Sequence, residues 1–114
     1  MEYITEDNRI LLRDATDKTV ALIEFPSIEE NTVEITHTEV AQELGGKGIA
    51  GELTKLAAQH IRTQHKKVVL TCSYAIRWFH KHPEFSDILK DKEKEEQKFS
   101  ELGGPACSIN AKRN

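Results

Sequence analysis

The amino-acid sequence predicts an α+β domain in which an antiparallel β-meander leads into a β-α-β crossover. Short β-rich runs separated by turn residues fill the N-terminal part of the chain, and from Gly48 the apolar period changes to that of a helix. The run VVLTC at 68–72 then supplies a further strand. A strand, a helix and a strand joined by short loops favour a right-handed crossover with parallel strands, and 114 residues suit a single domain.

Three runs form the predicted meander. Residues 8–13 (NRILLR) and 18–25 (KTVALIEF) flank DATD, whose Asp and Thr side chains can hydrogen-bond their own backbone, so these two runs predict a hairpin. Pro26 ends the second run because proline cannot donate a hydrogen bond to a neighbouring strand. Residues 31–40 (NTVEITHTEV) alternate between two sets of side chains and predict the third strand.

A long amphipathic helix and a shorter one make up the predicted helical part. One face of the first helix carries the apolar side chains Ile49, Leu53, Leu56, Ala57 and Ile61. Ser73 is the predicted N-cap of a second helix over 74–82, which Pro83 closes. Residues 90–114 contain few apolar side chains and many charges, and they predict a mobile or loosely helical tail. The sequence therefore divides into a domain at 1–89 and this charged tail.

Composition and charge narrow the class of function. A net charge of -3 without a long basic stripe disfavours a nucleic-acid binder, because binding to phosphate backbones requires clustered Lys and Arg. The sequence shows neither a signal peptide nor an apolar run of membrane length, so we expect a cytoplasmic protein without membrane contact, a monomer or weak dimer. Cys72 and Cys107 are expected to be reduced thiols, and neither their spacing nor that of His80 and His82 predicts a metal site.

Residues 43–53 (ELGGKGIAGEL) start a helix with no side chain that could cap it. The first N–H groups of a helix lack partners, and Ser, Thr, Asp or Asn usually covers them. Gly45, Gly46 and Gly48 leave the backbone bare, so the amides and the positive end of the helix dipole can hold an anion. One interpretation is a phosphate-bearing ligand; the other is a sharp strand-to-helix turn whose donors bind water. The spacing matches neither a P-loop nor a dinucleotide fingerprint.

The segment from Ile10 to Leu89 resembles the small single-domain branch of the GNAT acyl-CoA N-acyltransferases. The resemblance is carried by HTEVAQELGGKGIAGELTKLAAQHIRTQHKKVVLTCSY, followed by KHPEF. It implies a GNAT-like fold that takes acetyl-CoA as its cofactor, with a splayed parallel strand pair around the helix. The resemblance also implies that the pantetheine arm lies in this opening like an extra strand and pairs with backbone groups of residues 38–40.

The family holds the pyrophosphate of coenzyme A on the backbone amides of an element Q/R-x-x-G-x-G/A. Residues 45–50 correspond to this element, and Gly45 stands where the family usually carries Arg or Gln. A backbone contact is therefore expected in place of a side-chain contact to phosphate. Arg77 either meets a phosphate or the adenosine portion, or lies in solvent. The expected cofactor-binding residues are Thr38, Val40, Gly45, Gly46, Lys47, Gly48, Ile49, Ala50, Gly51 and Arg77.

Amine acylation needs a base for the amine, polarisation of the thioester carbonyl and a proton source for the leaving thiolate. A backbone N–H near residues 38–40 can polarise the carbonyl. His37 is the candidate base, because the ordinary pKa of histidine lies near neutrality. The alternative is a packed core histidine, since His37 shares a predicted strand face with Val33 and Ile35.

Two further catalytic candidates lie at the start of the second predicted helix. Cys72 can take the acyl group as a covalent intermediate or tune the site as a thiolate, and it can equally be an ordinary buried residue at a strand end. Tyr74 is the candidate acid for the leaving thiolate, by analogy with GNAT proteins that use a tyrosine on this helix. Its alternative is an aromatic side chain packed beside Trp78. Direct attack by the amine is the preferred mechanism.

The acceptor side is expected to be open and shallow. Full-size GNAT domains insert two helices between their first two strands, whereas only DATD is available here. An open face suits a protein, peptide or polyamine-like amine. The sequence thus predicts an acetyltransferase that uses acetyl-CoA and an unidentified amine. The alternatives are a non-catalytic acyl-CoA-binding module whose open face contacts a protein partner, and an interaction domain without a cofactor.

Overall fold

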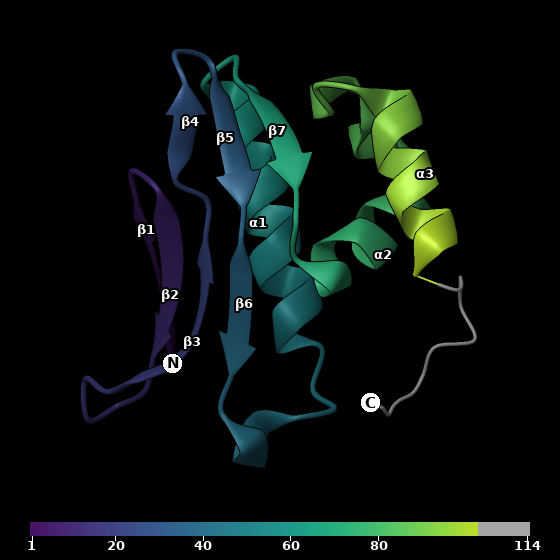
Figure 1. Cartoon of the computed structure of the whole chain (residues 1–114). Coiled ribbons are helices and arrows are strands. Elements are labelled where there is room, and N and C mark those ends of the chain that lie inside the picture. The colour runs from purple at the N-terminus through teal and green to yellow at the C-terminus, as the bar shows by residue number, and fades with distance from the viewer. Residues whose placement is uncertain (103–114) are drawn as a thin grey trace.

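A split β-sheet backed by helix α1 forms the core of the structure, a computed structural model that describes residues 1–102 (Figure 1). One part of the sheet has the antiparallel order β1 (Glu2–Glu6), β2 (Arg9–Arg13), β3 (Thr19–Glu24) and β6 (His37–Val40). The other part has the order β4 (Ser27–Glu29), β5 (Thr32–Ile35) and β7 (Lys67–Leu70), in which β5 and β7 are parallel. The α+β class and the β2–β3 hairpin predicted from the sequence are confirmed.

The third predicted strand is interrupted at Thr36, and this interruption divides the sheet. The sequence predicts one strand over 31–40, but β5 and β6 belong to different parts of the sheet. The Thr36 amide donates to the carbonyl oxygen of Glu24 at 3.2 Å, and His37 stands opposite the same residue. Two residues facing one make a β-bulge, which bends the strand. As a result, β6 pairs with β3 while β5 pairs with β7.

Two strands fall outside the predicted meander. β1 pairs with β2 through a tight turn at Asp7 and Asn8, and β4 is a three-residue strand beside β5. Most residues of β1 and all residues of β4 are exposed. Neither strand therefore carries the buried apolar alternation on which the sequence prediction depends.

Helix α1 (Ile49–Thr63) covers one face of the sheet (Figure 1). Its buried residues are Leu53, Thr54, Ala57, Ala58 and Ile61. The predicted crossover is confirmed, because α1 connects β5 and β6 to the parallel strand β7. The remaining helices are the short η1 (Gln42–Leu44), α2 (Ser73–Lys81), η2 (Pro83–Ile88) and α3 (Lys92–Glu101).

The predicted N-cap of α2 is wrong by one residue. Cys72, and not Ser73, occupies the N-cap position, and no side chain caps the helix. The Cys72 backbone is extended, with φ -78° and ψ 124°, while its carbonyl oxygen accepts a hydrogen bond from the Ile76 amide at 3.0 Å. An extended residue that accepts the first helical bond is by definition the N-cap. Cys72 thus lies at the positive end of α2.

The charged segment beyond residue 89 contains helix α3, where the sequence predicts a mobile or loosely helical tail. Glu95 in this helix is only 4% exposed. The Phe99 ring stacks on His80 of α2 with 3.7 Å between ring centroids. These contacts hold α3 against α2. The division into a domain at 1–89 and a tail at 90–114 stays a prediction, and Cys107 lies outside the described residues.

An ion pair joins α1 to η2 and gives the fold a pH dependence. Arg62 donates to both carboxylate oxygens of Asp87, at 2.5 and 3.1 Å, and these bonds hold the pKa of that carboxyl below its ordinary value. The pair therefore stabilises the fold above the ordinary pKa, and its contribution is lost as the pH falls through the lowered pKa. We expect Asp87→Asn to cost up to about 1 kcal/mol at pH 7 and nothing in strong acid. Urea unfolding at pH 7 and in strong acid tests this expectation. The control Glu30→Gln, at an exposed turn, should leave the free energy of unfolding unchanged at both pH values.

Candidate active site

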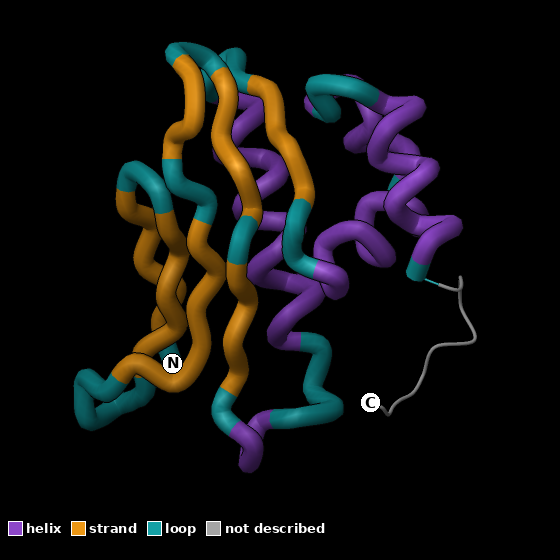
Figure 2. Tube along the Cα trace, viewed as in Figure 1, coloured by secondary structure: helices purple, strands orange, loops and turns teal. Residues whose placement is uncertain are grey.

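The loop between β6 and α1, drawn in teal around the short helix η1 in Figure 2, carries Gly45, Gly46 and Gly48. Leu44 of η1 is buried and anchors the loop in the core, whereas Gly45 to Gly48 are exposed. Gly46 has φ +81° and Gly48 has φ +76°, in the left-handed region that favours glycine. A Cβ atom at either position would meet no atom within 4 Å. The backbone conformation therefore requires these glycines, and the space beside them is open.

The amides at the start of α1 have no side-chain partner. Gly48 is the N-cap of the helix, and no side chain makes a capping hydrogen bond. The first intrahelical bond beyond the cap is donated by Glu52 to the Gly48 carbonyl oxygen at 3.0 Å. The N–H groups of residues 49–51 are therefore left for another acceptor, at the positive end of a fifteen-residue helix. The uncapped glycine start predicted from the sequence is confirmed.

The β6 strand presents unpaired backbone groups at the edge of its part of the sheet. The Ala41 amide donates to the Val20 carbonyl oxygen at 2.8 Å, which fixes which residues of this strand bond to β3. Because hydrogen-bonded residues alternate along an antiparallel strand, Thr38 and Val40 direct their N–H and C=O groups away from β3. No strand among residues 1–102 pairs with that edge of β6. An extended ligand can therefore bind there as an additional strand.

The opposite wall of this opening is the chain that follows β7. The amides of Thr71 and Cys72 both donate to the Ile35 carbonyl oxygen at 3.1 Å, the last backbone contact between this chain and β5. Cys72 Sγ then lies 3.7 Å from Thr38 Oγ1 across the opening. The structure thus brings the predicted residues Cys72 and Thr38 together, one on each side of the split sheet.

Tyr74 lies over the first turn of α1. A Cβ atom at Gly51 would come within 3.3 Å of the Tyr74 hydroxyl oxygen, so glycine makes room for this hydroxyl, whereas the 3.8 Å to Trp78 Nε1 is an ordinary contact. Partial burial raises the pKa of Tyr74, and the nearby Cys72 raises it further. Because the ordinary pKa of tyrosine is already about 10, the hydroxyl is protonated at neutral pH and can donate a proton. The Tyr74 hydroxyl therefore lies beside the first turn of α1 and close enough to Cys72 for the thiol to influence its pKa.

His37 is an exposed residue on the face of the sheet away from α1. Its side chain is 52% exposed, and its Nε2 atom lies 3.4 Å from Glu39 Oε2. The alternative of a packed core histidine is therefore wrong. The Thr36 bulge is the reason, since it breaks the alternation that connects His37 to the buried Val33 and Ile35. His37 and Thr38 point to opposite faces of β6, so the imidazole is not beside Cys72.

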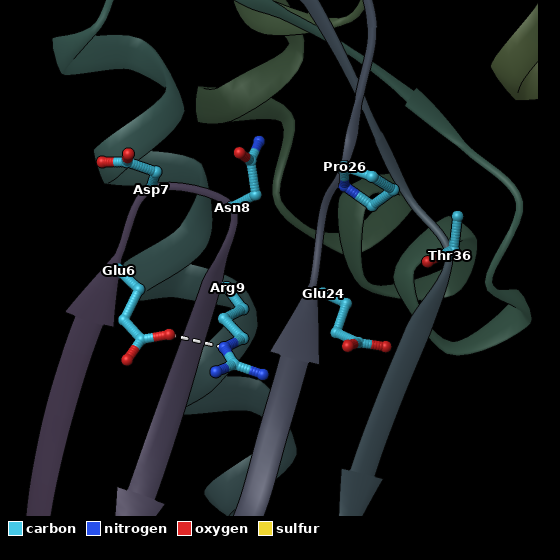
Figure 3. Close-up of a pocket in the computed structure, with 7 residues that line it drawn as sticks. All are labelled: Glu6, Asp7, Asn8, Arg9, Glu24, Pro26 and Thr36. Carbon is cyan, nitrogen blue, oxygen red and sulfur yellow. Dashed lines mark hydrogen bonds and ion pairs between the residues drawn. The ribbon is translucent and has the colours of Figure 1, made fainter.

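A cavity of about 490 Å³ opens on the same face of the sheet, at the β1–β2 turn (Figure 3). Its lining residues are Glu6, Asp7, Asn8, Arg9, Glu24, Pro26 and Thr36. Arg9 pairs with Glu6 at 2.5 Å, which leaves the lining with an excess of negative charge. His37 lies opposite Glu24 in the β3–β6 register and thus beside the cavity. The cavity could not be predicted from the sequence, because its wall depends on the mostly exposed strand β1.

Two further residues predicted to bind the cofactor, Lys47 and Arg77, make few contacts that indicate a role. Lys47 is exposed on the glycine loop. Arg77 is partly buried, and its Nε atom has no hydrogen-bond partner within residues 1–102. In the same part of the chain, no three His, Cys, Asp or Glu side chains are grouped so that they could hold a metal ion. None of the described helices is long and apolar enough to span a membrane.

A split sheet with a parallel strand pair and a bare glycine loop at the start of the crossover helix is a GNAT-like fold. The chain belongs to the GCN5-related N-acetyl-transferase family, whose sequence model matches residues 9–88. The resemblance to the small single-domain branch of the GNAT family, stated from the sequence, is confirmed.

Individual relatives agree with this assignment. The chain is similar to Protein NATD1 from Xenopus tropicalis and from Homo sapiens, with 32% and 31% identity over 74 residues. These 74 residues are 65% of this chain, 66% of the frog protein and 64% of the human protein. A GCN5-like protein from Staphylococcus aureus, solved by NMR, has a TM-score of 0.64 and 28% identity over 77% of this chain and 86% of its own.

A more distant solved structure shares the fold alone. Rv2747 from Mycobacterium tuberculosis, whose crystal structure contains CoA, has a TM-score of 0.55 and 18% identity. The match covers 67% of this chain and 47% of Rv2747. Binding of CoA is thus a property of a protein with this fold.

Proposed function

We propose that this chain transfers the acetyl group of acetyl-CoA to an amine. The observation that carries the proposal is the uncapped start of α1, which lies at the end of the unpaired β6 edge. The bare amides of residues 46–51 suit a diphosphate, and the outward backbone groups of Thr38 and Val40 suit the amide groups of a pantetheine arm. The open space beside Gly48 leaves room for such a ligand. Arg77, with its unpartnered Nε atom, is a further candidate for a phosphate contact.

We assign the steps of acyl transfer to residues on both sides of strand β6. Acetyl-CoA supplies a thioester, and acyl transfer forms a C–N bond while the C–S bond breaks. The Val40 N–H, directed into the opening, stabilises the negative charge that develops on the carbonyl oxygen. His37, exposed beside the acidic cavity, takes the proton that the amine loses. Tyr74, protonated at neutral pH, donates a proton to the departing sulfur.

Cys72 lies at this site, but the proposed mechanism does not require it to form a covalent intermediate. Its sulfur lies 3.7 Å from Thr38 Oγ1, so the thiol can contact the acyl group from the β7 side of the opening. Direct attack by the amine is the simpler route, because it needs no second transfer. An acetyl adduct on Cys72, detected by mass spectrometry after incubation with acetyl-CoA, would replace direct attack with a two-step transfer.

The acceptor is proposed to be a cationic protein, peptide or polyamine-like amine. The connection from β1 to β2 is only the turn at Asp7 and Asn8, shorter than the DATD connection from which the open face was predicted. No helix of residues 1–102 covers the sheet face opposite α1 (Figure 1). The carboxylates of Glu6, Asp7 and Glu24 line the cavity on that face. An open acidic surface favours a large cationic acceptor over an enclosed small molecule.

Calorimetry and a thiol-release assay test the proposal together. Millimolar acetyl-CoA is expected to bind with measurable heat and to raise the melting temperature, because a ligand of the native state stabilises it. With a lysine-rich peptide, the chain should release free CoA. Tyr74→Phe should lower kcat by about 100-fold or more and leave the KM for acetyl-CoA little changed. Tyr3→Phe, on the exposed strand β1, is the matched control. Absence of both heat and a thermal shift in the wild-type chain would refute the proposal.

A non-catalytic acyl-CoA-binding module is the second candidate function. The short β1–β2 turn favours it, since the turn leaves the acceptor side without walls that would hold an amine in place. This candidate shares the ligand but not the reaction. Binding of acetyl-CoA without any thiol release above the chemical background would favour it over the transferase.

A further inference from the structure

Helix α3 completes the outer edge of β7 with two side chains. The amides of Lys67 and Thr71 bond to Asn31 and Ile35, so the intervening Leu70 directs its backbone groups away from β5. Glu95 Oε2 accepts a hydrogen bond from the Leu70 amide at 3.3 Å. Lys98 Nζ donates to the Leu70 carbonyl oxygen at 2.8 Å. Together the two side chains occupy the positions that a neighbouring strand would fill.

These two side chains also form an ion pair in a mostly buried place, in which Glu95 Oε1 has no hydrogen-bond partner among residues 1–102. Lys98 Nζ lies 3.2 Å from Glu95 Oε1 and donates to Oε2 at 3.3 Å. The Glu95 side chain is 4% exposed and that of Lys98 is 26% exposed. A buried carboxylate is costly unless it is paired and hydrogen-bonded, so this arrangement depends on both Lys98 and Leu70. The stacked rings of Phe99 and His80 keep α3 at this distance from α2.

Leu70 lies two residues before Cys72, at the point where the sheet opens. Leu70 itself is 1% exposed and is held on one side by β5 and on the other by α3. The next two amides both bond to the Ile35 carbonyl oxygen, after which the chain enters α2. Leu70 and the Ile35 carbonyl oxygen therefore both hold the chain at the point where it leaves β5 for Cys72 and α2.

We propose that Glu95 and Lys98 are positioning residues of the acetyl-CoA site. By holding Leu70, they keep Cys72 and Tyr74 at the separation from β6 that the ligand requires. The proposal rests on the acetyl-CoA function proposed above. It assigns a role in that site to a helix that follows the family-matched residues 9–88.

Calorimetry with acetyl-CoA and amide hydrogen exchange by NMR test the proposal on the full chain. In Glu95→Ala, the Leu70 amide loses its acceptor, so its exchange should accelerate about tenfold and acetyl-CoA affinity should fall about tenfold. Glu95→Gln keeps an oxygen that accepts from Leu70 and should recover most of the affinity. Glu93→Ala, at an exposed position of the same helix, is the matched control and should bind as the wild type does.

The outcomes separate this proposal from the proposed function. If the wild-type chain does not bind acetyl-CoA, the proposed function fails. If the wild type binds and a folded Glu95→Ala variant binds equally well, α3 only supports the fold and the positioning role is overturned. Should Glu95→Ala not fold, the wild-type chain still decides, because coupling between two sites is reciprocal. Saturating acetyl-CoA should then slow exchange of the Leu70 amide, and an unchanged rate would overturn the proposal.

Discussion

Replacing Gly48 with Asp is expected to abolish acetyl-CoA binding without unfolding the chain. The position has open space around it and a φ of +76°, which Asp and Asn tolerate better than other side chains do. A carboxylate there would lie where the bare amides of α1 are proposed to hold a diphosphate. Charges of like sign about 4 Å apart repel by several kcal/mol near a protein surface, so we expect an affinity loss of at least about 100-fold.

Gly48→Asn is the matched control because it carries the same shape and backbone strain without the charge. It should lose far less affinity than Gly48→Asp. The negative side chain also lies at the positive end of the α1 dipole, so Gly48→Asp should be at least as stable as Gly48→Asn. Calorimetry at low and high salt measures the difference, which should shrink as salt screens the repulsion. Equal binding by the two variants would show that no anion binds at the α1 amides.

The glycine loop could be predicted from the sequence because its properties are local. Three glycines without a capping side chain before an amphipathic run already predict bare amides, and the positive φ of Gly46 and Gly48 agrees with this prediction. The crossover was predictable for a similar reason, since period and length distinguish the helix from its flanking strands. The resemblance to a known family then supplied the ligand, which periodicity alone does not name.

The bulge at Thr36 could not be predicted, because its cause lies in another strand. Residues 31–40 alternate without a break in sequence, and only the Glu24 carbonyl oxygen, which accepts from the Thr36 amide, reveals the irregularity. A single inserted residue reverses which face a side chain occupies. His37 was for this reason assigned to the face of Val33 and Ile35, although it is exposed beside the acidic cavity.

The packing of α3 against the rest of the domain could not be predicted, because the amino-acid composition of this segment is typical of an exposed one. The segment is rich in Lys and Glu, and only Phe99 within the helix indicates an apolar contact. Glu95 is buried because it accepts from Leu70, a residue 25 positions earlier in the chain. Such a contact depends on the exposed backbone edge of β7, which exists only once the sheet has formed. Charge content alone therefore underestimates how much of this segment is folded.

Val40→Pro is expected to remove catalysis while the ladder between β3 and β6 stays intact. Proline eliminates one N–H group, and at residue 40 that group points away from β3 into the opening. Loss of a single donor to a developing oxyanion costs about 100- to 1,000-fold in kcat, so we expect a loss of this size. Thiol-release kinetics with acetyl-CoA and a lysine-rich peptide measure it.

Two variants distinguish the missing N–H from other effects of the substitution. Val40→Ala shortens the same partly buried side chain but keeps the amide, so it should retain most of the activity. Glu39→Pro removes the neighbouring amide, which bonds to β3, and should instead lower the melting temperature. If Val40→Pro turned over acetyl-CoA as fast as Val40→Ala, the Val40 amide would have no part in polarising the carbonyl. The oxyanion would then need another donor along the same edge, and the Thr38 amide is the one that the alternation of β6 leaves free.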